Sequence, residues 1–165
     1  MTSSDAVVTL ESSPFFQQFL PKHLEKLLNL GSEVHFAKEQ VIFPEGDETP
    51  VFYVIVSGRV ALESHPGGRE KRVQILYPGE ELGWSSVLGR KKQFQARALE
   101  PVEALALEVA DLRSACASNP YFGCAFLERL LTVVAERLEV TRAQLADALA
   151  APPSRRAETA ARDDD

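Results

Sequence analysis

The spacing of hydrophobic residues divides the chain into a helical start, a middle of short strands and a helical end. In residues 13–31 leucines recur at helical spacing, and Gly31 follows them as a stop signal. From residue 32 to 109 the pattern changes to short β-branched or aromatic runs separated by Gly- and Pro-containing turns. After Val109 the spacing is helical again, so strands are expected only in the middle.

The middle region predicts about eight short strands. Residues 51–58, "VFYVIVSG", form a continuous apolar run that is typical of a strand buried on both faces. Residues 59–64 and 70–77 alternate between apolar and polar positions on either side of a hairpin loop, "HPGGR". Short runs at 32–38, 40–43, 95–100 and 102–109 complete the pattern. Such strands favour a mainly β fold with flanking helices, an eight-stranded antiparallel β-roll or jelly roll.

The last part of the chain predicts a short helix over 110–119 and then a long one over about 119–149. Asn119 is a good N-cap, and Pro120 suits the first helical position. The apolar residues of the long helix are spaced alternately four and three apart, which is the seam of a parallel coiled coil. We therefore predict a homodimer, with a helix that lies on its own roll as the alternative. The predicted dimerisation residues are Leu127, Leu131, Val134, Leu138, Thr141 and Leu145.

Composition and charge narrow the classes of function. Hydrophobic residues make up 45% of the chain and charged ones 25%, as in ordinary globular proteins. No apolar run is long enough to span a membrane, and residues 1–13 do not resemble a secretion signal, so we expect a cytoplasmic location. The net charge of −6 has the wrong sign for a general nucleic-acid binder, and the basic clusters at 69–72 and 90–92 fit solvated loops.

The domain organisation follows from these patterns. We expect a flexible start over 1–13, a folded domain over 14–149, and a disordered tail over 150–165 that is small, charged and rich in proline. Cys116 and Cys124 are too few for a disulfide framework or an iron–sulfur cluster, so we expect buried or half-buried thiols.

One stretch of the chain resembles a known family. Residues 43–64, "FPEGDETPVFYVIVSGRVALES", are similar to the strand–turn–strand signature of the cyclic nucleotide-binding domain, which occurs in the cyclic AMP receptor protein and in kinases and ion channels. Gly46 and Gly58 stand where that family turns sharply. The order of elements agrees over about residues 14–149. The resemblance implies a cupin-like β-roll, a dimerising helix and a regulatory or sensory function.

The resemblance continues into the phosphate-binding cassette of the family, "YPGEELGWSSVLG" in this chain. The family pattern begins Phe-Gly-Glu, and Leu82 and Gly83 fill its first two places. Trp84 replaces the Glu that accepts a hydrogen bond from the ribose hydroxyl, and an indole cannot accept one. Trp84 either plugs the pocket or stacks on an aromatic ligand. Ser85 and Ser86 in the following helical turn either cap the helix or contact an anion.

The second half of the cassette pattern is Pro-Arg-x-Ala-Thr-x-x-Ala. Lys91 or Lys92 stands near the Arg that binds the phosphate, and a lysine lacks its bidentate geometry. Gln95 occupies the position at which the pattern has Thr, and Ala98 matches the last Ala of the pattern. The ligand-binding residues implied by the resemblance are Leu82, Gly83, Trp84, Ser85, Ser86, Lys91, Lys92, Gln95 and Ala96.

These observations favour a dimeric sensory module that binds a small anion other than a typical cyclic nucleotide. The alternative is a scaffold that binds no ligand and docks a partner protein. A transcription factor of the receptor family carries a winged helix-turn-helix after the long helix, and only residues 150–165 follow it here, so we expect no direct nucleic-acid contact.

An enzyme is the remaining class. His23, His35 and His65 fall in a predicted helix, strand and turn, and none shows His-x-His spacing. No nucleophile stands next to a base in the pattern. We therefore expect no catalytic residue, no metal ligand and no cofactor.

Overall fold

The computed structural model describes residues 10–13, 15–17 and 19–150. Most of the predicted flexible start and disordered tail lies outside these residues. The chain divides into two compact units, one ending at Arg129 and the other beginning at Leu130. Each unit is described by itself.

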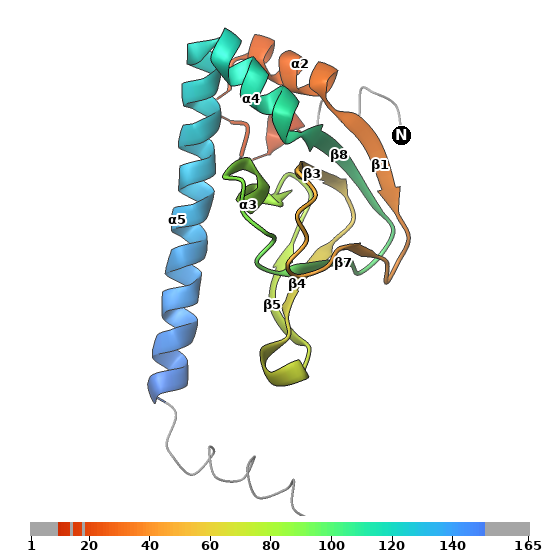
Figure 1. Ribbon diagram of the computed structural model, residues 1–165, viewed down its shortest axis with the longest axis vertical. Helices are drawn as coiled ribbons and strands as arrows, with labels where there is room; N and C mark the ends of the chain where they lie inside the picture. Colours follow the sequence, from red (N-terminus) through yellow and green to blue (C-terminus); the bar gives the residue numbers. More distant parts are fainter. Residues whose placement is uncertain (1–9, 14, 18, 151–165) are drawn as a thin grey trace, which may run out of the picture. The chain divides into compact units, whose positions relative to one another are not determined.

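The first unit is built on two four-stranded antiparallel sheets (Figure 1). One sheet has the order β1-β8-β3-β6 and the other the order β2-β7-β4-β5. The strands are β1 Ser32–Phe36, β2 Val41–Phe43, β3 Val51–Ser57, β4 Val60–Ser64, β5 Lys71–Leu76, β6 Glu81–Leu82, β7 Gln95–Ala98 and β8 Val102–Glu108. The predicted eight-stranded roll is therefore confirmed, although β6 is too short for its pattern to have been noticed.

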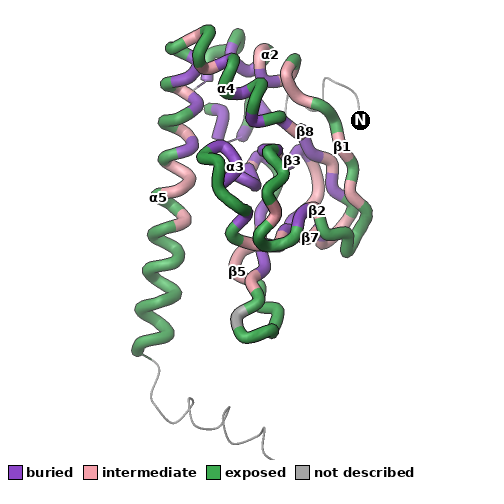
Figure 2. Tube along the Cα trace, viewed as in Figure 1, coloured by how far each residue is buried: buried purple, intermediate pink, exposed green. Residues whose placement is uncertain are grey.

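The roll holds a hydrophobic core to which both sheets contribute (Figure 2). Five of the seven residues of β3 are buried, as the continuous apolar run predicted. On β1, Val34 and Phe36 pack against the core, whereas His35 between them is exposed. The buried members of the cluster are Phe43, Ile55, Val60, Leu62, Leu76, Leu82, Ala96, Ala98, Val102 and Ala104.

Helix α2, Pro21–Leu30, packs Leu24 and Leu27 into the interior and ends at Gly31, as predicted. The reason for glycine there is close packing, not a left-handed backbone. Gly31 has an extended φ of −88°. A Cβ at this position would lie 2.4 Å from Cδ1 of Leu105, so any side chain here would have to displace the Leu105 side chain of β8.

The remaining helices are α3 Trp84–Val87, α4 Val109–Ser118 and α5 Pro120–Ala150, with a 3₁₀ turn, η1, at Pro66–Gly68. The Asn119 side-chain oxygen accepts a hydrogen bond of 3.2 Å from the backbone N–H of Phe122, which confirms the predicted cap of α5. Phe122 and Phe126 in the first turns of α5 are buried. Both belong to an aromatic cluster that also includes Phe15, Phe16, Phe19 and Phe52.

A histidine is buried at the edge of this aromatic cluster. His23 of α2 is only 4% exposed, and its ring lies 5.6 Å from that of Phe122 and 6.4 Å from that of Phe19. Neither ring nitrogen has a hydrogen-bond partner among the described residues. Burial lowers the pKa of His23, and the positive charges of Lys22 and Lys26 lower it further. The imidazole is therefore held neutral in the folded chain.

We expect His23→Leu to raise the free energy of unfolding at neutral pH by about 1 kcal/mol, because an unsatisfied buried polar group costs about 1–3 kcal/mol. Because the folded pKa is lowered, the unfolded chain takes up a proton below about pH 6.5 more readily than the folded chain does. Stability of the wild type therefore falls as the pH drops through this range. Urea denaturation at several pH values between 5 and 7.5 measures both effects.

In the same urea experiment His35→Gln is the control, because His35 is exposed on β1. Wild-type and His23→Leu stabilities that fall in parallel with pH would contradict this account of the buried imidazole.

Candidate functional site

The cassette lies where β6 meets the short helix α3. Gly83 joins them with a φ of +86°, in the left-handed region that favours glycine. A Cβ at Gly83 would also lie 2.9 Å from the carbonyl oxygen of Val51, so the position excludes side chains for two reasons. The glycine therefore brings the start of α3 against the beginning of β3.

The structure separates the two lysines between which the sequence could not choose. Lys91 is exposed, and its ammonium forms an ion pair of 3.1 Å with Glu48. Lys92 is only 2% exposed and points inward. Its ammonium donates to the carbonyl oxygens of Thr49 at 2.7 Å and Val51 at 3.1 Å, and also to the hydroxyl oxygen of Ser86. Lys92 is thus the lysine that lies against α3.

These contacts make Lys92 an internal clamp between the cassette and the loop before β3. An ammonium has three N–H donors, and three protein acceptors lie within its reach. The backbone of Lys92 adds two bonds of 2.8 Å, to the carbonyl of Asp47 and from the N–H of Gly46. Burial lowers the pKa of Lys92, while the charge of Asp47 acts in the opposite direction.

The contact between Ser86 and Lys92 raises the question of a nucleophile and its base. In such a pair a neutral lysine accepts the serine proton. Here the Lys92 nitrogen donates to two carbonyls that cannot themselves donate, and Ser86 Oγ lies 3.2 Å from the Thr49 carbonyl as a donor. This pattern is that of a protonated lysine in a structural clamp. In this clamp the Ser86 hydroxyl accepts from Lys92 and donates to the Thr49 carbonyl, so it is already occupied by protein groups and not free for the anion that the sequence suggested as an alternative partner.

The other predicted site residues lie in different surroundings. Trp84 is half-buried at the start of α3, and Ser85 is buried. The Gln95 amide donates a bond of 2.9 Å to Glu63, a carboxylate that also pairs with Arg97 at 3.1 Å. The structure therefore places Gln95 in an ion network of β4 and β7. Leu82 and Ala96 are core residues.

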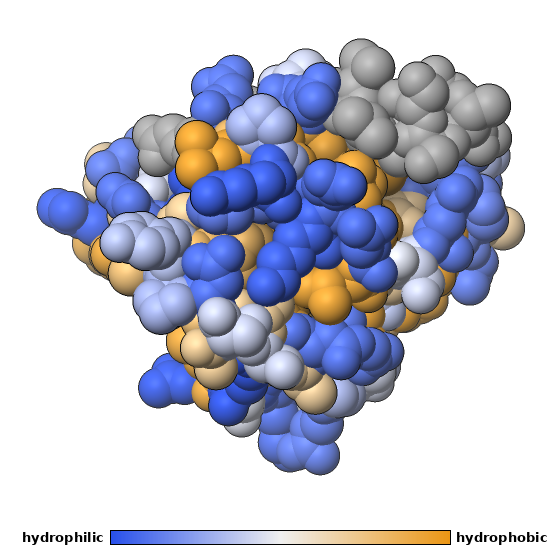
Figure 3. Space-filling model, turned by 90° about the horizontal axis from the view of Figure 1, so that it is seen from above, coloured by the Kyte–Doolittle hydropathy of each residue, from blue (hydrophilic) through white to orange (hydrophobic). Residues whose placement is uncertain are grey.

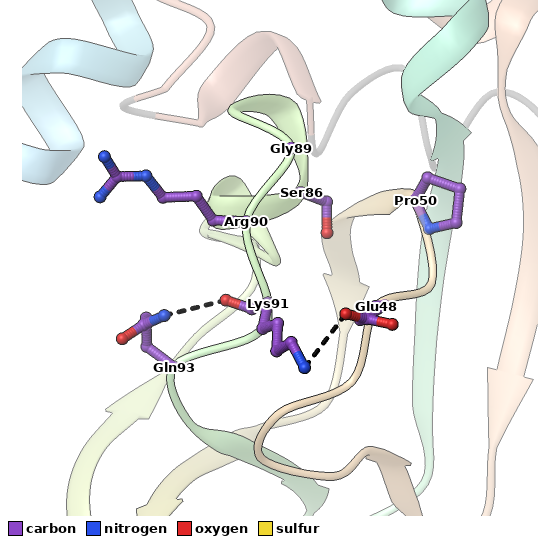
Figure 4. Close-up of a pocket in the computed structure, with 7 residues that line it drawn as sticks. All are labelled: Glu48, Pro50, Ser86, Gly89, Arg90, Lys91 and Gln93. Atoms are coloured by element: carbon purple, nitrogen blue, oxygen red, sulfur yellow. Dashed lines mark hydrogen bonds and ion pairs between the residues drawn. The ribbon is translucent and has the colours of Figure 1, made fainter.

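A surface pocket of about 530 Å³ opens beside the cassette (Figure 4). Two of the predicted site residues, Ser86 and Lys91, line it. The side chains of Lys91 and Glu48 approach each other across it, whereas that of Arg90 points away from this pair. Its other lining residues were not predicted and are Glu48, Pro50, Gly89, Arg90 and Gln93.

Arg90 is a candidate site residue that is absent from the set predicted from the sequence. The sequence predicts a solvated loop for the basic cluster at 90–92, and the resemblance implies a ligand-binding role there only for Lys91 and Lys92. In the described part of the chain the Arg90 guanidinium makes no hydrogen bond or ion pair, although Lys91 and Lys92 beside it both do. A positive group that lines a pocket and has no protein partner is suited to an anion.

Phe94 is a further departure from the cassette pattern. In the register fixed by Gln95 and Ala98, it stands at the first Ala of the pattern, where the family has a small side chain. Phe94 packs against the core of the roll. The cassette therefore carries a bulky aromatic residue two positions after Lys92.

Helix α5 presents most of its predicted seam to solvent. The exposed fractions of Leu127, Leu131, Leu138 and Leu145 are 52%, 69%, 58% and 58%. Val134 is half-buried, and the exposed Thr141 donates its hydroxyl to the carbonyl of Arg137 at 2.8 Å.

The two thiols differ in exposure. Cys116 is half-buried, as expected, and burial raises its pKa. Cys124 is exposed, so the prediction of a buried or half-buried thiol is wrong for this residue. The reason is its place on α5, three residues before the exposed Leu127 and on the same seam.

Two observations concern the hydropathy of the surface and of the helices. On the face drawn in Figure 3, hydrophilic side chains predominate and hydrophobic ones appear as patches between them. Among the described residues no helix has the length and apolar character that a membrane span requires.

Comparison with known proteins gives matches over most of the roll. Residues 33–119 match the sequence profile of the cyclic nucleotide-binding domain. A CRP-like cAMP-activated global transcriptional regulator of Mycobacterium tuberculosis is 30% identical over 140 residues, which cover 84% of this chain and 61% of the regulator. A cyclic AMP receptor protein of Thermus thermophilus is 32% identical over 100 residues, which cover 59% of this chain and 46% of that protein.

A solved structure agrees with these matches. The crystal structure of the Thermus thermophilus catabolite activator protein is 29% identical, with a TM-score of 0.71, and the match covers 81% of this chain and 62% of that one. The chain thus spans about three fifths or less of the length of these relatives.

Proposed function

The chain belongs to the cyclic nucleotide-binding domain family, and we propose that it is a regulatory module whose cassette takes a small anion other than a cyclic nucleotide. The proposed module forms a homodimer along α5 and passes the ligand signal to that helix or to a partner protein. A cytoplasmic location stays a prediction. The proposal is consistent with the regulatory relatives and departs from them in the chemistry of the cassette.

The observation that carries the proposal is the saturation of Lys92. In the pattern the phosphate is held by an Arg at this position, and here Thr49, Val51 and Ser86 already use the ammonium. A phosphate bound to Lys92 would have to compete with three protein acceptors. Because Trp84 also replaces the ribose-binding Glu, both charged contacts to a cyclic nucleotide are missing or occupied.

The pocket beside α3 offers a different place for an anion. Its volume of about 530 Å³ lies in the range of small-molecule sites. Arg90 supplies a guanidinium without a protein partner in the described residues. Gln93 also lines the pocket, and its amide N–H donates to the Lys91 carbonyl at 3.0 Å. Lys91 becomes available when a ligand displaces the exposed Glu48 carboxylate. We propose that Lys91 binds the charge of the ligand and that the Arg90 side chain, which points away from Lys91 in the structure, turns toward the ligand and adds a second positive group.

The contacts of Lys92 also favour the alternative function, a dimeric scaffold that binds no ligand. Lys92 stabilises the cassette with protein groups alone, so the fold does not need a ligand to neutralise this charge. In that case the exposed leucines of α5 serve dimerisation or docking without a signal from the roll.

Calorimetric titration with cyclic AMP, cyclic GMP and a panel of nucleotide, carboxylate and phenolate anions tests the proposal. We expect binding to a panel member that is tighter than binding to either cyclic nucleotide. Arg90→Gln should weaken this binding by about ten- to a hundredfold, since a charge-assisted hydrogen bond contributes about 1.5–3 kcal/mol.

Arg69→Gln, in the hairpin loop of β4 and β5, is the matched control for the removed charge. No heat from any anion would support the scaffold, and tight binding of cyclic AMP by the wild type would overturn the proposed chemistry.

A further inference from the structure

We propose that Glu33, His35 and Glu103 form a surface site for one divalent transition-metal ion, with Zn²⁺ as its representative. One ligand atom from each residue lies within 4.8 Å of those of the other two. This inference is independent of the proposed function, because the residues lie on β1 and β8 and none belongs to the cassette.

The fold places these side chains together through strand geometry. Glu33 and His35 are two residues apart on β1, so their side chains leave the strand on the same face. Val34 and Phe36 occupy the opposite face and pack on the core. His35 stands directly opposite Glu103 of β8 in the register of the sheet. The three side chains therefore meet on the outer face of the roll.

The charge of the cluster is suited to a cation. His35 Nε2 lies 3.5 Å from a Glu33 oxygen, and Nδ1 lies 3.8 Å from a Glu103 oxygen. No lysine or arginine of the described residues pairs with either carboxylate. The imidazole is thus the sole positive partner within the cluster, and only when it is protonated. A bound divalent ion would neutralise both carboxylates.

The ligand types select the class of metal. One imidazole with two carboxylates is a set that Zn²⁺ and its neighbours accept, whereas Ca²⁺ and Mg²⁺ prefer oxygen ligands alone. Ligand atoms around tetrahedral zinc lie about 3.3 Å apart, given bonds of about 2 Å. The ligand atoms, which lie up to 4.8 Å apart, need to close by up to about 1.5 Å to reach this geometry, and a water can take the fourth position.

Two further features fit a metal site. The Ser57 hydroxyl donates to the Glu103 oxygen Oε2 at 3.1 Å, which fixes this carboxylate as outer-shell bonds fix metal ligands. β1 is an edge strand of its sheet, and among the described residues it pairs only with β8. An ion shared by Glu33, His35 and Glu103 would join these two strands and stabilise the edge of the roll.

Isothermal titration of the EDTA-treated full chain with ZnCl₂ at pH 7.5 tests the site. We expect one equivalent of zinc to bind and the midpoint of thermal unfolding to rise. His35→Gln should lower the affinity at least tenfold and remove the rise.

His65→Gln is the matched control. His65 also lies between two carboxylates, Glu45 at 3.5 Å and Glu70 at 3.7 Å, but Glu70 is already paired with Arg97 at 3.1 Å. The thiol of Cys124 and the other zinc-binding groups are the same in both variants. The difference between the zinc affinities of the two variants therefore reports the contribution of His35. Equal zinc affinity of the two histidine variants would overturn the proposal, as would a wild type that binds no stoichiometric zinc.

Discussion

Trp84→Glu combined with Lys92→Arg is expected to raise the affinity of the chain for cyclic AMP by about 10²- to 10⁴-fold over the wild type. Each substitution restores a charge-assisted contact of about 1.5–3 kcal/mol, one to the ribose hydroxyl and one to the phosphate. An Arg also offers two parallel donors where Lys92 offers a point charge. Calorimetric titration of the double variant with cyclic AMP measures the gain.

The single variants show whether the clamp matters. Trp84→Glu alone should gain less than tenfold, because Thr49, Val51 and Ser86 still hold the Lys92 ammonium. The two gains should therefore be more than additive, as for residues of one network. Circular dichroism confirms that the double variant is folded. A folded double variant that binds cyclic AMP no better than the wild type would show that the loss of the nucleotide site has another cause.

Leu131→Lys combined with Leu138→Lys is expected to convert a dimer into a monomer. Burial of a leucine side chain contributes about 1.5–3 kcal/mol, and the two substitutions affect four positions in a symmetric dimer. We expect the association constant to fall by at least 10³-fold, which sedimentation equilibrium measures. A wild type that is monomeric at micromolar concentration would contradict the predicted seam.

Two residues of α5 sharpen this experiment. Val140 is 44% exposed but stands two residues beyond the seam position Leu138, so Val140→Lys is the control and should leave the dimer intact. Cys124 stands on the seam, so in a parallel dimer the two copies face each other. Mild oxidation should then give a disulfide-linked dimer, and Cys124→Ser should abolish it. An antiparallel pair would not form this link.

Most of the fold could be predicted because its signals are local. The apolar run of β3, the cap at Asn119 and the stop at Gly31 each lie within a few residues of the element that they define. β6 has only two residues, which is too few to show a period. Its existence depends on pairing with Tyr53 and Val54 of β3, and a single-sequence pattern does not report that pairing.

The site was less predictable because its contacts are distant in sequence. Lys91 and Lys92 are adjacent, yet one lies in solvent and the other is buried, and partners more than forty residues earlier decide between them. His35 and Glu103 likewise meet only through the register of β1 and β8. Spacing along the chain could suggest residue types for these places but not their partners.

The buried ammonium of Lys92 has a kinetic consequence. Any anion that uses this group must wait until it leaves the carbonyls of Thr49 and Val51. Binding at this point is then an exchange of partners, and its observed rate levels off at the rate of internal release however much ligand is added. The contacts of the Lys92 side chain within the cassette would thus make ligand binding slow even where the final affinity is high.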